Sequence, residues 1–364
     1  MFGRVRVVAF VPVICVIATA CAYGSAAAAT TSVSPCSRVI QPTWSPDGTQ
    51  IAYYGTRWPP PAHPHRNSND ILQALCTANA DGTNVQPVRY TVCSERCPDA
   101  PVPIVWLQGG ILYLQGGDIF RIAPGSKPRR IARPSAVSMV TNPAGTRIAT
   151  DLFYSGCLSC AGPVTILDAQ SGAVVGSVGG KKLENINPSL SPDGTKVAFE
   201  RNASDDSGKT FGIWTANVDG SRLRQLVKVG QQPLWSPAGG KVAYVAPSGK
   251  SVALRLILAG GGKSRALVPR VSTVFGWSPD GKSIAVELGG ETLGKLAVVD
   301  IATGKVRTLL QLPYWPTAVW SPDSSELLVN TVTKINRVTG TAKCWATWRV
   351  PVDGTTPTQI STCS

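Results

Sequence analysis

A five-residue motif, Trp44 to Gly48, recurs along the chain and constrains its fold more than any other feature. Each copy reads Trp-Ser-Pro-Asp-Gly or close to it and is followed, two residues on, by an apolar run such as Ile51 to Tyr54. Proline presets the second position of a type I turn, and glycine accepts the left-handed conformation that closes a four-residue hairpin loop. Each copy therefore predicts a strand, a tight turn and another strand. Further copies begin at Leu190, Trp235, Trp277 and Trp320, and a degenerate copy begins at Asn142.

The glycine of each turn is expected in the left-handed conformation, because a residue with a Cβ meets a steric penalty there. Ser324 takes this position in the last copy, so we expect the last unit to be the least regular. The prediction covers Gly48, Gly194, Gly239 and Gly281.

A second hairpin follows each motif, with a turn such as Asp81-Gly82 or Asp219-Gly220. Two hairpins make four strands per unit, and successive motifs from Leu190 onward lie 42 to 45 residues apart. This period is typical of propeller blades and not of a helical solenoid. We therefore predict an all-β chain built of four-stranded antiparallel blades.

The number of blades depends on residues 104–131, which lack the motif. This segment has its own β-rich runs and Gly-Gly turns, so we interpret it as a compact blade of four strands. Counting it gives a seven-bladed β-propeller. If it is not an independent blade, the count falls to six.

The motif and its register resemble the WD40-like repeat of TolB-type β-propellers, over roughly residues 37–364. The resemblance implies the propeller fold and a protein-interaction or cell-envelope role, with no catalytic residues and no cofactor. The α/β domain that precedes the propeller in TolB has no counterpart here, since only about a dozen residues separate the expected leader from the first blade. The resemblance to TolB-type propellers therefore carries over the fold.

Residues 1–29 have the pattern of a secretory signal peptide: two arginines, an apolar run from Val7 to Ala20, and small residues before the expected cleavage site. The remaining residues 30–364 form one propeller domain and hold no apolar run long enough to span a membrane. We expect a secreted, periplasmic or cell-envelope monomer. Lipid anchoring at Cys21 is the less favoured alternative, because Ala18 is smaller than the residue usually found at that position.

The net charge of +14 becomes +12 without the leader, which carries two arginines and no acid. Such a charge favours an anionic partner: a wall polymer, lipid head groups or an acidic protein. The basic residues are scattered, and the densest cluster, Lys127 to Arg133, contains no aromatic residue. We therefore do not expect nucleic-acid binding.

Eight cysteines follow the leader, and an oxidising compartment would pair them. Cys157 and Cys160 lie close enough for a local disulfide, and the residues around them have no thioredoxin-like βαβ pattern. The first blade and the connector after it contain three more, which we expect to cross-link that blade: Cys76, Cys93 and Cys97.

Closure of the ring is a separate question, because the last unit supplies all four of its own strands and shares none with the first. Cys363 follows the outermost strand, and Cys36 precedes Trp44 by eight residues. A Cys36–Cys363 bridge would clasp the disc covalently. A Cys344–Cys363 bridge, across the last hairpin, is the competing prediction, and the two stay open.

Signs of catalysis are few. His63 and His65, the two histidines of the chain, lie in a Pro-rich insert without nearby cysteine or carboxylate ligands, so they make a poor zinc site. Gly262-Lys263-Ser264 lacks the upstream glycine and the helix of a phosphate-binding loop. The turn aspartates are expected to hydrogen-bond their own backbone. We expect no metal or cofactor and leave enzymatic activity open.

The loop lengths point to a binding surface. In an up-and-down blade the first and third turns emerge on one face, here with short and uniform turns, and we call it the plain face. The second turns and the blade connectors emerge on the other, which carries the long segments and which we call the loop-rich face. Variable loops on a rigid scaffold usually carry binding residues. The residues most able to anchor a partner there are Trp58, Arg66, Tyr154, Asp205, Tyr314 and Trp315.

Three functional classes follow. The leading interpretation is a noncatalytic propeller that binds a protein or an anionic polymer through the loop-rich face. The alternative is a glycan or lactone lyase or hydrolase that uses loop acids with His63 or His65. The third is an envelope sensor or accessory ectodomain.

Overall fold

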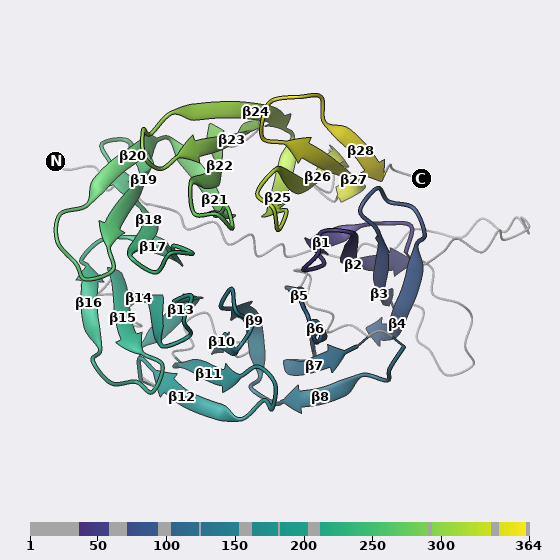
Figure 1. Cartoon of the computed structure of the whole chain (residues 1–364), viewed down its shortest axis with the longest axis horizontal. Helices are drawn as coiled ribbons and strands as arrows, with labels where there is room; N and C mark the ends of the chain where they lie inside the picture. The colour runs from purple at the N-terminus through teal and green to yellow at the C-terminus, as the bar shows by residue number, and fades with distance from the viewer. Residues whose placement is uncertain are drawn as a thin grey trace, which may run out of the picture.

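The chain forms a ring of seven four-stranded antiparallel sheets in the computed structural model (Figure 1). The described residues contain no helix, so none of them belongs to a helix that could cross a membrane. The seven-bladed all-β propeller is confirmed, and the six-bladed alternative is wrong. The structure describes residues 36–57, 71–93, 103–123, 125–152, 162–180, 183–202, 212–289, 293–335 and 342–361.

Each blade consists of four strands that follow one another in the sequence. The first strand lies nearest the central axis and the fourth lies at the rim (Figure 1). The compact segment expected as an independent blade is blade 2. Blades 1 to 4 consist of β1 (Ile40–Trp44), β2 (Gln50–Arg57), β3 (Ile71–Asn79) and β4 (Gln86–Cys93); β5 (Val105–Leu107), β6 (Gly110–Gln115), β7 (Asp118–Ile122) and β8 (Arg129–Ala132); β9 (Ala136–Thr141), β10 (Arg147–Leu152), β11 (Val164–Asp168) and β12 (Val174–Val178); and β13 (Glu184–Leu190), β14 (Lys196–Asn202), β15 (Gly212–Asn217) and β16 (Arg224–Val227).

The last three blades repeat the arrangement and supply the strands that meet blade 1. All four strands of blade 7 come from the C-terminal unit, as predicted. Blades 5 to 7 consist of β17 (Gln231–Trp235), β18 (Lys241–Ser248), β19 (Ser251–Leu258) and β20 (Arg265–Pro269); β21 (Val271–Trp277), β22 (Ser283–Gly289), β23 (Gly294–Asp300) and β24 (Val306–Leu312); and β25 (Tyr314–Trp320), β26 (Glu326–Ile335), β27 (Ala342–Pro351) and β28 (Thr358–Ser361).

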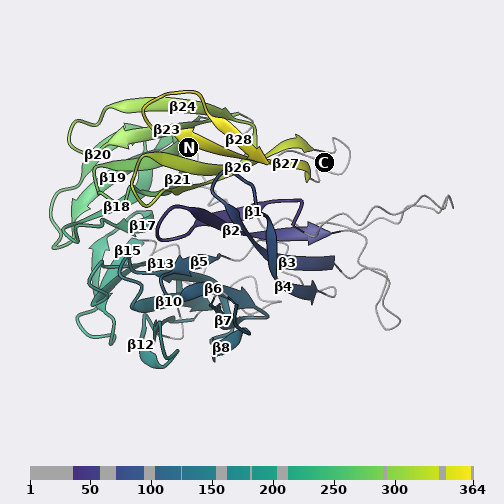
Figure 2. The ribbon, with the colours of Figure 1, turned by 45° about the vertical axis from the view of Figure 1, so that its right-hand side comes forward.

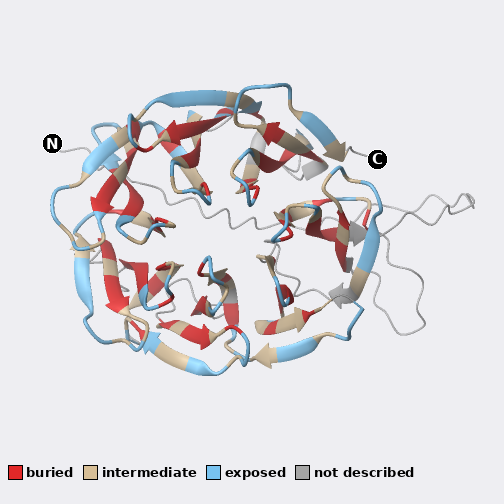
Figure 3. Ribbon diagram, in the orientation of Figure 1, coloured by how far each residue is buried: buried red, intermediate tan, exposed pale blue. Residues whose placement is uncertain are grey.

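The core lies between the blades. The second and third strands carry most of the buried side chains, while the fourth strands are largely exposed (Figure 3). Buried apolar residues form seven clusters, and each cluster joins two neighbouring blades. Since a β-sheet face must be covered to be stable, each blade depends on both of its neighbours. We therefore expect the ring to unfold as one cooperative unit.

The tryptophan of the repeated motif forms a hydrogen bond across three of these seams. The indole N–H of Trp277 donates to the carbonyl of Leu234 in the preceding blade at 3.1 Å, and that of Trp320 donates to Gly276 at 3.1 Å. Trp44 makes the same bond to Val319 of blade 7 at 3.3 Å. Trp235 differs, because its indole donates to Gly239 of its own turn. The closing seam thus uses the same contact as the seams between blades 5 and 6 and between blades 6 and 7.

Other contacts complete closure between blades 7 and 1, which lie side by side in Figures 1 and 2. The buried side chain of Asn330 on β26 donates to the carbonyl of Val39, just before β1, at 3.0 Å. Leu328 of β26 belongs to the apolar cluster of blade 1, and Ile360 of β28 packs against it. Closure therefore rests on apolar packing and side-chain hydrogen bonds, without a shared sheet.

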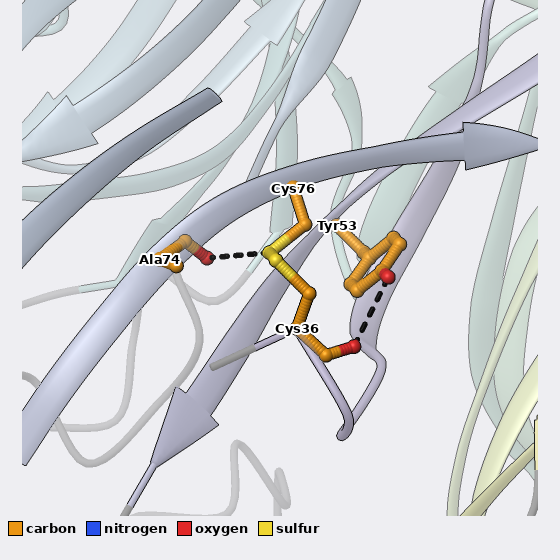
Figure 4. The surroundings of a disulfide bond; sticks show 4 residues. All are labelled: Cys36, Tyr53, Ala74 and Cys76. Carbon is orange, nitrogen blue, oxygen red and sulfur yellow. Dashed lines mark hydrogen bonds between the residues drawn. A yellow bond between two sulfur atoms is a disulfide. The ribbon is translucent and has the colours of Figure 1, made fainter. Parts of the chain in front are cut away.

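The predicted Cys36–Cys363 clasp is wrong, because Cys36 is bonded to Cys76 (Figure 4). The segment before β1 folds back over its own blade, where the hydroxyl of Tyr53 donates to the Cys36 carbonyl at 3.1 Å. This bridge agrees with the expectation that Cys76 cross-links the first blade. Among the other cysteines, only the backbones of Cys93 and Cys344 are described; Cys97, Cys157, Cys160 and Cys363 lie outside the described residues, so the remaining pairings stay predictions.

The turn prediction is confirmed. The motif glycines have φ values between +68° and +78°, in the left-handed region. Ser324 adopts the same conformation with φ +65°, and the 3.0 Å turn bond from its N–H to Ser321 is kept. Its hydroxyl also accepts a hydrogen bond from the N–H of Asp280 in blade 6 at 3.1 Å. The turn of the last unit therefore keeps the geometry of the others. The strand pairing of blade 7 has four register shifts among the described residues, more than that of any other blade, which agrees with our expectation that the last unit is the least regular. The glycines concerned are Gly48, Gly194, Gly239 and Gly281.

Two adjacent glycines allow a matched test of this turn. Gly239 has φ +78°, whereas Gly240 is not left-handed and has open space around its Cβ position. We expect Gly239→Ala to lower the free energy of unfolding by about 1 to 2 kcal/mol, because an L-residue is strained there. Gly240→Ala should be neutral or slightly stabilising. Denaturant titration of both variants measures the difference, and equal effects would contradict the assigned turn.

Candidate functional site

The six residues predicted to anchor a partner fall where the structure gives no side-chain description. Trp58, Arg66, Tyr154 and Asp205 lie outside the described residues, as do His63 and His65. Tyr314 and Trp315 belong to β25, but their side chains are not described. These assignments therefore stay predictions.

The aspartates of the repeated turns are structural, as expected. The carboxylate of Asp47 accepts hydrogen bonds from the Ser45 hydroxyl at 2.5 Å and from the backbone and hydroxyl of Thr49. These bonds lower the pKa of Asp47 below its usual value. Asp193 repeats the arrangement with Ser191 and Thr195. Their carboxylates are committed to holding the turn.

Three charged side chains are buried in the part of the chain that the structure describes: Asp151, Glu200 and Arg201. Their exposed fractions are 6%, 2% and 5%. Asp151 lies near the end of β10, and Glu200 and Arg201 lie near the end of β14. Both strands end toward the loop-rich face, so the buried charges gather there in blades 3 and 4. Buried ionisable groups cluster at functional sites more often than elsewhere, which makes this group the candidate site.

Asp151 and Glu200 are linked through Asn187 on β13. The backbone N–H of Asn187 donates to Asp151 at 3.2 Å, and its side-chain amide donates to Glu200 at 3.2 Å. Asp151 also accepts a hydrogen bond from the Ser138 hydroxyl, and Glu200 accepts one from the N–H of Gln232 in blade 5 at 3.3 Å. Asp151 therefore forms a hydrogen bond across the seam between blades 3 and 4, and Glu200 forms one across the seam between blades 4 and 5.

Local backbone geometry aims the donors at these acids. Asn187 and Gln232 have φ values of +51° and +52°, each precedes a proline, and each lies where the strand register shifts. In a β-bulge the extra residue does not take part in the hydrogen bonds between the two strands, so the backbone N–H of that residue can donate to another group. Gln41 of blade 1 has the same conformation, with φ +48°. The Asn-Pro and Gln-Pro pairs in the first strands are the sequence signal of this device.

The position of the acids can be recognised in every blade, although sequence reasoning missed it. Each second strand contains a mostly apolar stretch of three residues, and the residue that follows this stretch faces the next seam. At two seams this residue is an acid whose carboxylate accepts a hydrogen bond from the next blade. At a third seam it is an asparagine whose side-chain amide donates to the next blade, and at a fourth it is a tyrosine whose hydroxyl lies 3.5 Å from a carbonyl of the next blade. In blade order the residues at this position are Tyr54, Leu114, Asp151, Glu200, Val245, Glu287 and Asn330.

Arg201 lies on the other side of the same sheet, toward blade 3. Its Nε donates to the side-chain oxygen of Asn185 at 3.0 Å, and its Nη2 donates to the carbonyl of Gly179 at 3.0 Å. The guanidinium carbon lies 4.2 Å from the centre of the Trp214 ring and 5.5 Å from that of Phe199. Such stacking is a favourable cation–π arrangement.

Burial dominates the electrostatics of the site. Desolvation raises the pKa of Glu200 and of Asp151 above their usual values, although hydrogen bonds oppose the rise. Desolvation also lowers the pKa of Arg201. Among the described residues, no ion pair joins Arg201 to a carboxylate or joins either acid to a cation. Within the described residues, the site thus holds charges of both signs whose hydrogen-bond partners are neutral groups.

Two hollows lie elsewhere, at the seam between blades 7 and 1. One, of about 460 Å³, is lined by apolar residues around the disulfide, including Cys36, Tyr53 and Ile360. The other, of about 400 Å³, lies on the plain face beside Arg349, which makes a 2.6 Å ion pair with Glu326. Their lining groups serve ring closure, so we do not count either hollow as the candidate site.

The described residues contain no group of three or more His, Cys, Asp and Glu side chains able to hold a metal ion. Asp151 and Glu200 are already bound to neighbouring hydrogen-bond donors.

Comparison with known proteins identifies the fold. No protein-family model and no curated protein matches the chain. TolB from Acinetobacter baumannii is 15% identical with a TM-score of 0.50, over 87% of this chain and 80% of that one. An oligogalacturonate lyase in complex with manganese is 14% identical with a TM-score of 0.59, over 85% and 88%. The oligogalacturonate lyase from Vibrio parahaemolyticus is 13% identical with a TM-score of 0.59, over 80% and 85%.

These likenesses show the fold alone. TolB and other propellers share the architecture at low identity, which supports the resemblance seen in the repeated motif at the level of fold. Function must therefore be argued from the residues of this chain.

The buried carboxylates predict a pH dependence of stability. A raised folded-state pKa means that the folded protein binds more protons than the unfolded chain, so the free energy of unfolding falls as pH rises through that pKa. For Glu200 this window lies above its usual value of 4.5. We expect Glu200→Gln to reduce the slope there, measured by urea unfolding at several pH values.

A turn aspartate provides the matched control. The pKa of Asp219 is lowered by its turn hydrogen bonds, so its contribution to stability is lost only as pH falls below the usual 3.8. Asp219→Asn should leave the slope above pH 4.5 unchanged. A Glu200→Gln variant with the wild-type slope would show that Glu200 is not the titrating group.

Proposed function

We propose that the chain is a noncatalytic binding module of the cell envelope or the secreted space, and that its loop-rich face holds an anionic polymer. The observation that carries the proposal is the distribution of exposed charge between the two faces. A rigid ring with long segments on one face gives such a module its scaffold.

All exposed aspartates and glutamates of the described residues lie in first or third turns, on the plain face: Asp47, Asp81, Asp193, Asp219, Asp280, Asp323 and Asp353. On the loop-rich face, by contrast, the described acids are buried or partly buried, and several exposed cations stand near strand ends and connectors. Positive charge on the loop-rich face attracts a polyanion to that face, while the carboxylates of the plain face repel it. These cations are Arg133, Lys228, Lys250, Arg270, Lys295 and Lys334.

The arginines at the rim are engaged in structure instead. Arg224 donates to the carbonyl of Ala259 in the next blade at 2.7 Å, and Arg265 donates to Ile301 at 2.6 Å. Arg121 and Arg307 make the same bond to their next blades. Part of the positive charge thus ties neighbouring blades together. Among the cations of the loop-rich face, Arg133 lies 3.9 Å from the carboxylate of Asp118, and the other five form no ion pair with a described residue, so these five are the ones we assign to a partner.

The expected compartment agrees with the disulfide. A Cys36–Cys76 bond persists where thiols are oxidised, as in secreted and periplasmic proteins. The signal-peptide pattern of residues 1–29, which lie outside the described residues, points the same way.

A second candidate is a lyase that acts on an acidic glycan. It is favoured by the raised pKa values of Asp151 and Glu200, which suit acid–base chemistry. Both acids, however, already hold the donors of neighbouring blades. Cleavage of polygalacturonate by the wild type, lost in Glu200→Gln, would favour the lyase over the binding module.

The proposal is tested with two polyanions, polygalacturonate and polyphosphate, by calorimetric titration. We expect binding to weaken with salt, because exposed charges are screened. Replacing Lys228, Lys250 and Arg270 by alanine should weaken it by about tenfold, from the typical value of exposed ion pairs.

The matched control removes the same charge from the plain face, where Lys196, Lys241 and Lys282 are exposed beside the first turns. Their replacement by alanine should change affinity far less. Equal losses in the two triple variants would contradict a directional binding face. Failure of the wild type to bind either polymer, together with binding of an acidic protein, would shift the proposal to a protein partner.

A further inference from the structure

Arg201 differs from the other cations of the described residues because it alone is buried. It lies one residue before the end of β14, toward the loop-rich face, at the seam between blades 3 and 4. A buried charge normally has a partner of opposite charge, since taking it out of water is costly. What surrounds Arg201 therefore bears on its role.

The guanidinium is held in one orientation by neutral groups. Asn185 turns its oxygen toward Arg201 because its amide nitrogen is bound to three backbone carbonyls, those of Gly162, Gly180 and Leu183, at 2.8 to 3.2 Å. Gly179 supplies the second acceptor, with φ +99°. Trp214 covers the flat side of the guanidinium at 4.2 Å. These contacts fix the position of the guanidinium, and each of the three groups is neutral.

No carboxylate among the described residues forms an ion pair with Arg201. Glu200 is its neighbour in the chain, but successive residues of a strand point to opposite faces, and Glu200 bonds toward blade 5. Nε and Nη2 have acceptors, whereas no described residue accepts a hydrogen bond from Nη1. Within the described residues, Nη1 is thus the donor of the guanidinium that a further oxygen could meet.

We infer that Arg201 is the anchor for an oxyanion group of the bound partner, either a carboxylate or a phosphate oxygen. The inference rests on the proposed binding of an anionic polymer and adds the residue that would fix its position. An oriented guanidinium suits planar oxyanions, and its low exposure gives the contact more strength than a cation in open solvent. The exposed cations of the loop-rich face would attract the polymer, and Arg201 would hold it.

The first experiment observes Arg201 directly. In protein labelled with 15N-arginine, the Nε–H resonance that disappears in Arg201→Lys identifies the residue. Titration with acetate and with inorganic phosphate should shift this resonance saturably, whereas sodium chloride at equal ionic strength should not. Absence of a saturable shift with both anions would overturn the inference. A response to only one anion would distinguish the carboxylate from the phosphate.

The second experiment measures polymer affinity in matched variants. Arg201→Lys and Arg201→Gln should each weaken binding of polygalacturonate or polyphosphate at least tenfold, while Arg270→Gln removes an exposed cation from the same face and should weaken it less than threefold. Near-ultraviolet circular dichroism establishes that each variant is folded, and the conservative lysine variant serves if glutamine is not tolerated.

The outcomes separate the two proposals. If the wild type binds and all three variants lose affinity equally, binding is diffuse, and the anchor role is overturned while the proposed function stands. If the wild type binds neither polymer but the Arg201 resonance responds to acetate or phosphate, the site is an oxyanion site and the proposed polymer function fails.

Discussion

The structure depends on the seam between neighbouring blades, because no blade can cover its own sheet. Each seam combines an apolar cluster with a few directed hydrogen bonds. At the seams between blades 5 and 6, 6 and 7, and 7 and 1, an indole of the repeated motif donates one of these bonds. The seam between the last and first blades repeats both parts through Trp44 and Val319. Ring closure therefore needs no strand exchange, since the chain ends meet as two ordinary neighbours.

The same seams place the candidate site. The position on the second strand that is Leu114 in blade 2 and Val245 in blade 5 is Asp151 in blade 3 and Glu200 in blade 4. The seams that follow blades 3 and 4 therefore bury a carboxylate near the loop-rich face. Asn187 links the two carboxylates, and Arg201 lies on the opposite side of the sheet among neutral acceptors. The residues that make the ring also position the groups that could recognise a partner. The loops predicted to carry Tyr154 and Asp205 continue from the same two strands.

Much of the fold could be predicted from the sequence, because turn chemistry and a period of 42 to 45 residues are local signals. The blade count followed even for residues 104–131, where glycine pairs replace the motif. Disulfide pairing could not be predicted, since the path of the segment around Cys36 depends on packing over blade 1. The buried charges were missed because Glu200 and Arg201 occur at the end of an apolar run, where neither the turn motif nor the loop lengths direct attention. The position that these buried charges share among the blades can be recognised only when the blades are superimposed.

Native-state hydrogen exchange tests most directly the claim that the closing seam is equivalent to the internal ones. The account predicts that amides of β1 and β2 exchange through the same global opening as those of β17 and β18, with equal free energies within error. Exchange of β1 to β4 as a separate unit, at a clearly lower free energy than blade 5, would contradict it and show that the ring opens at the junction of its ends.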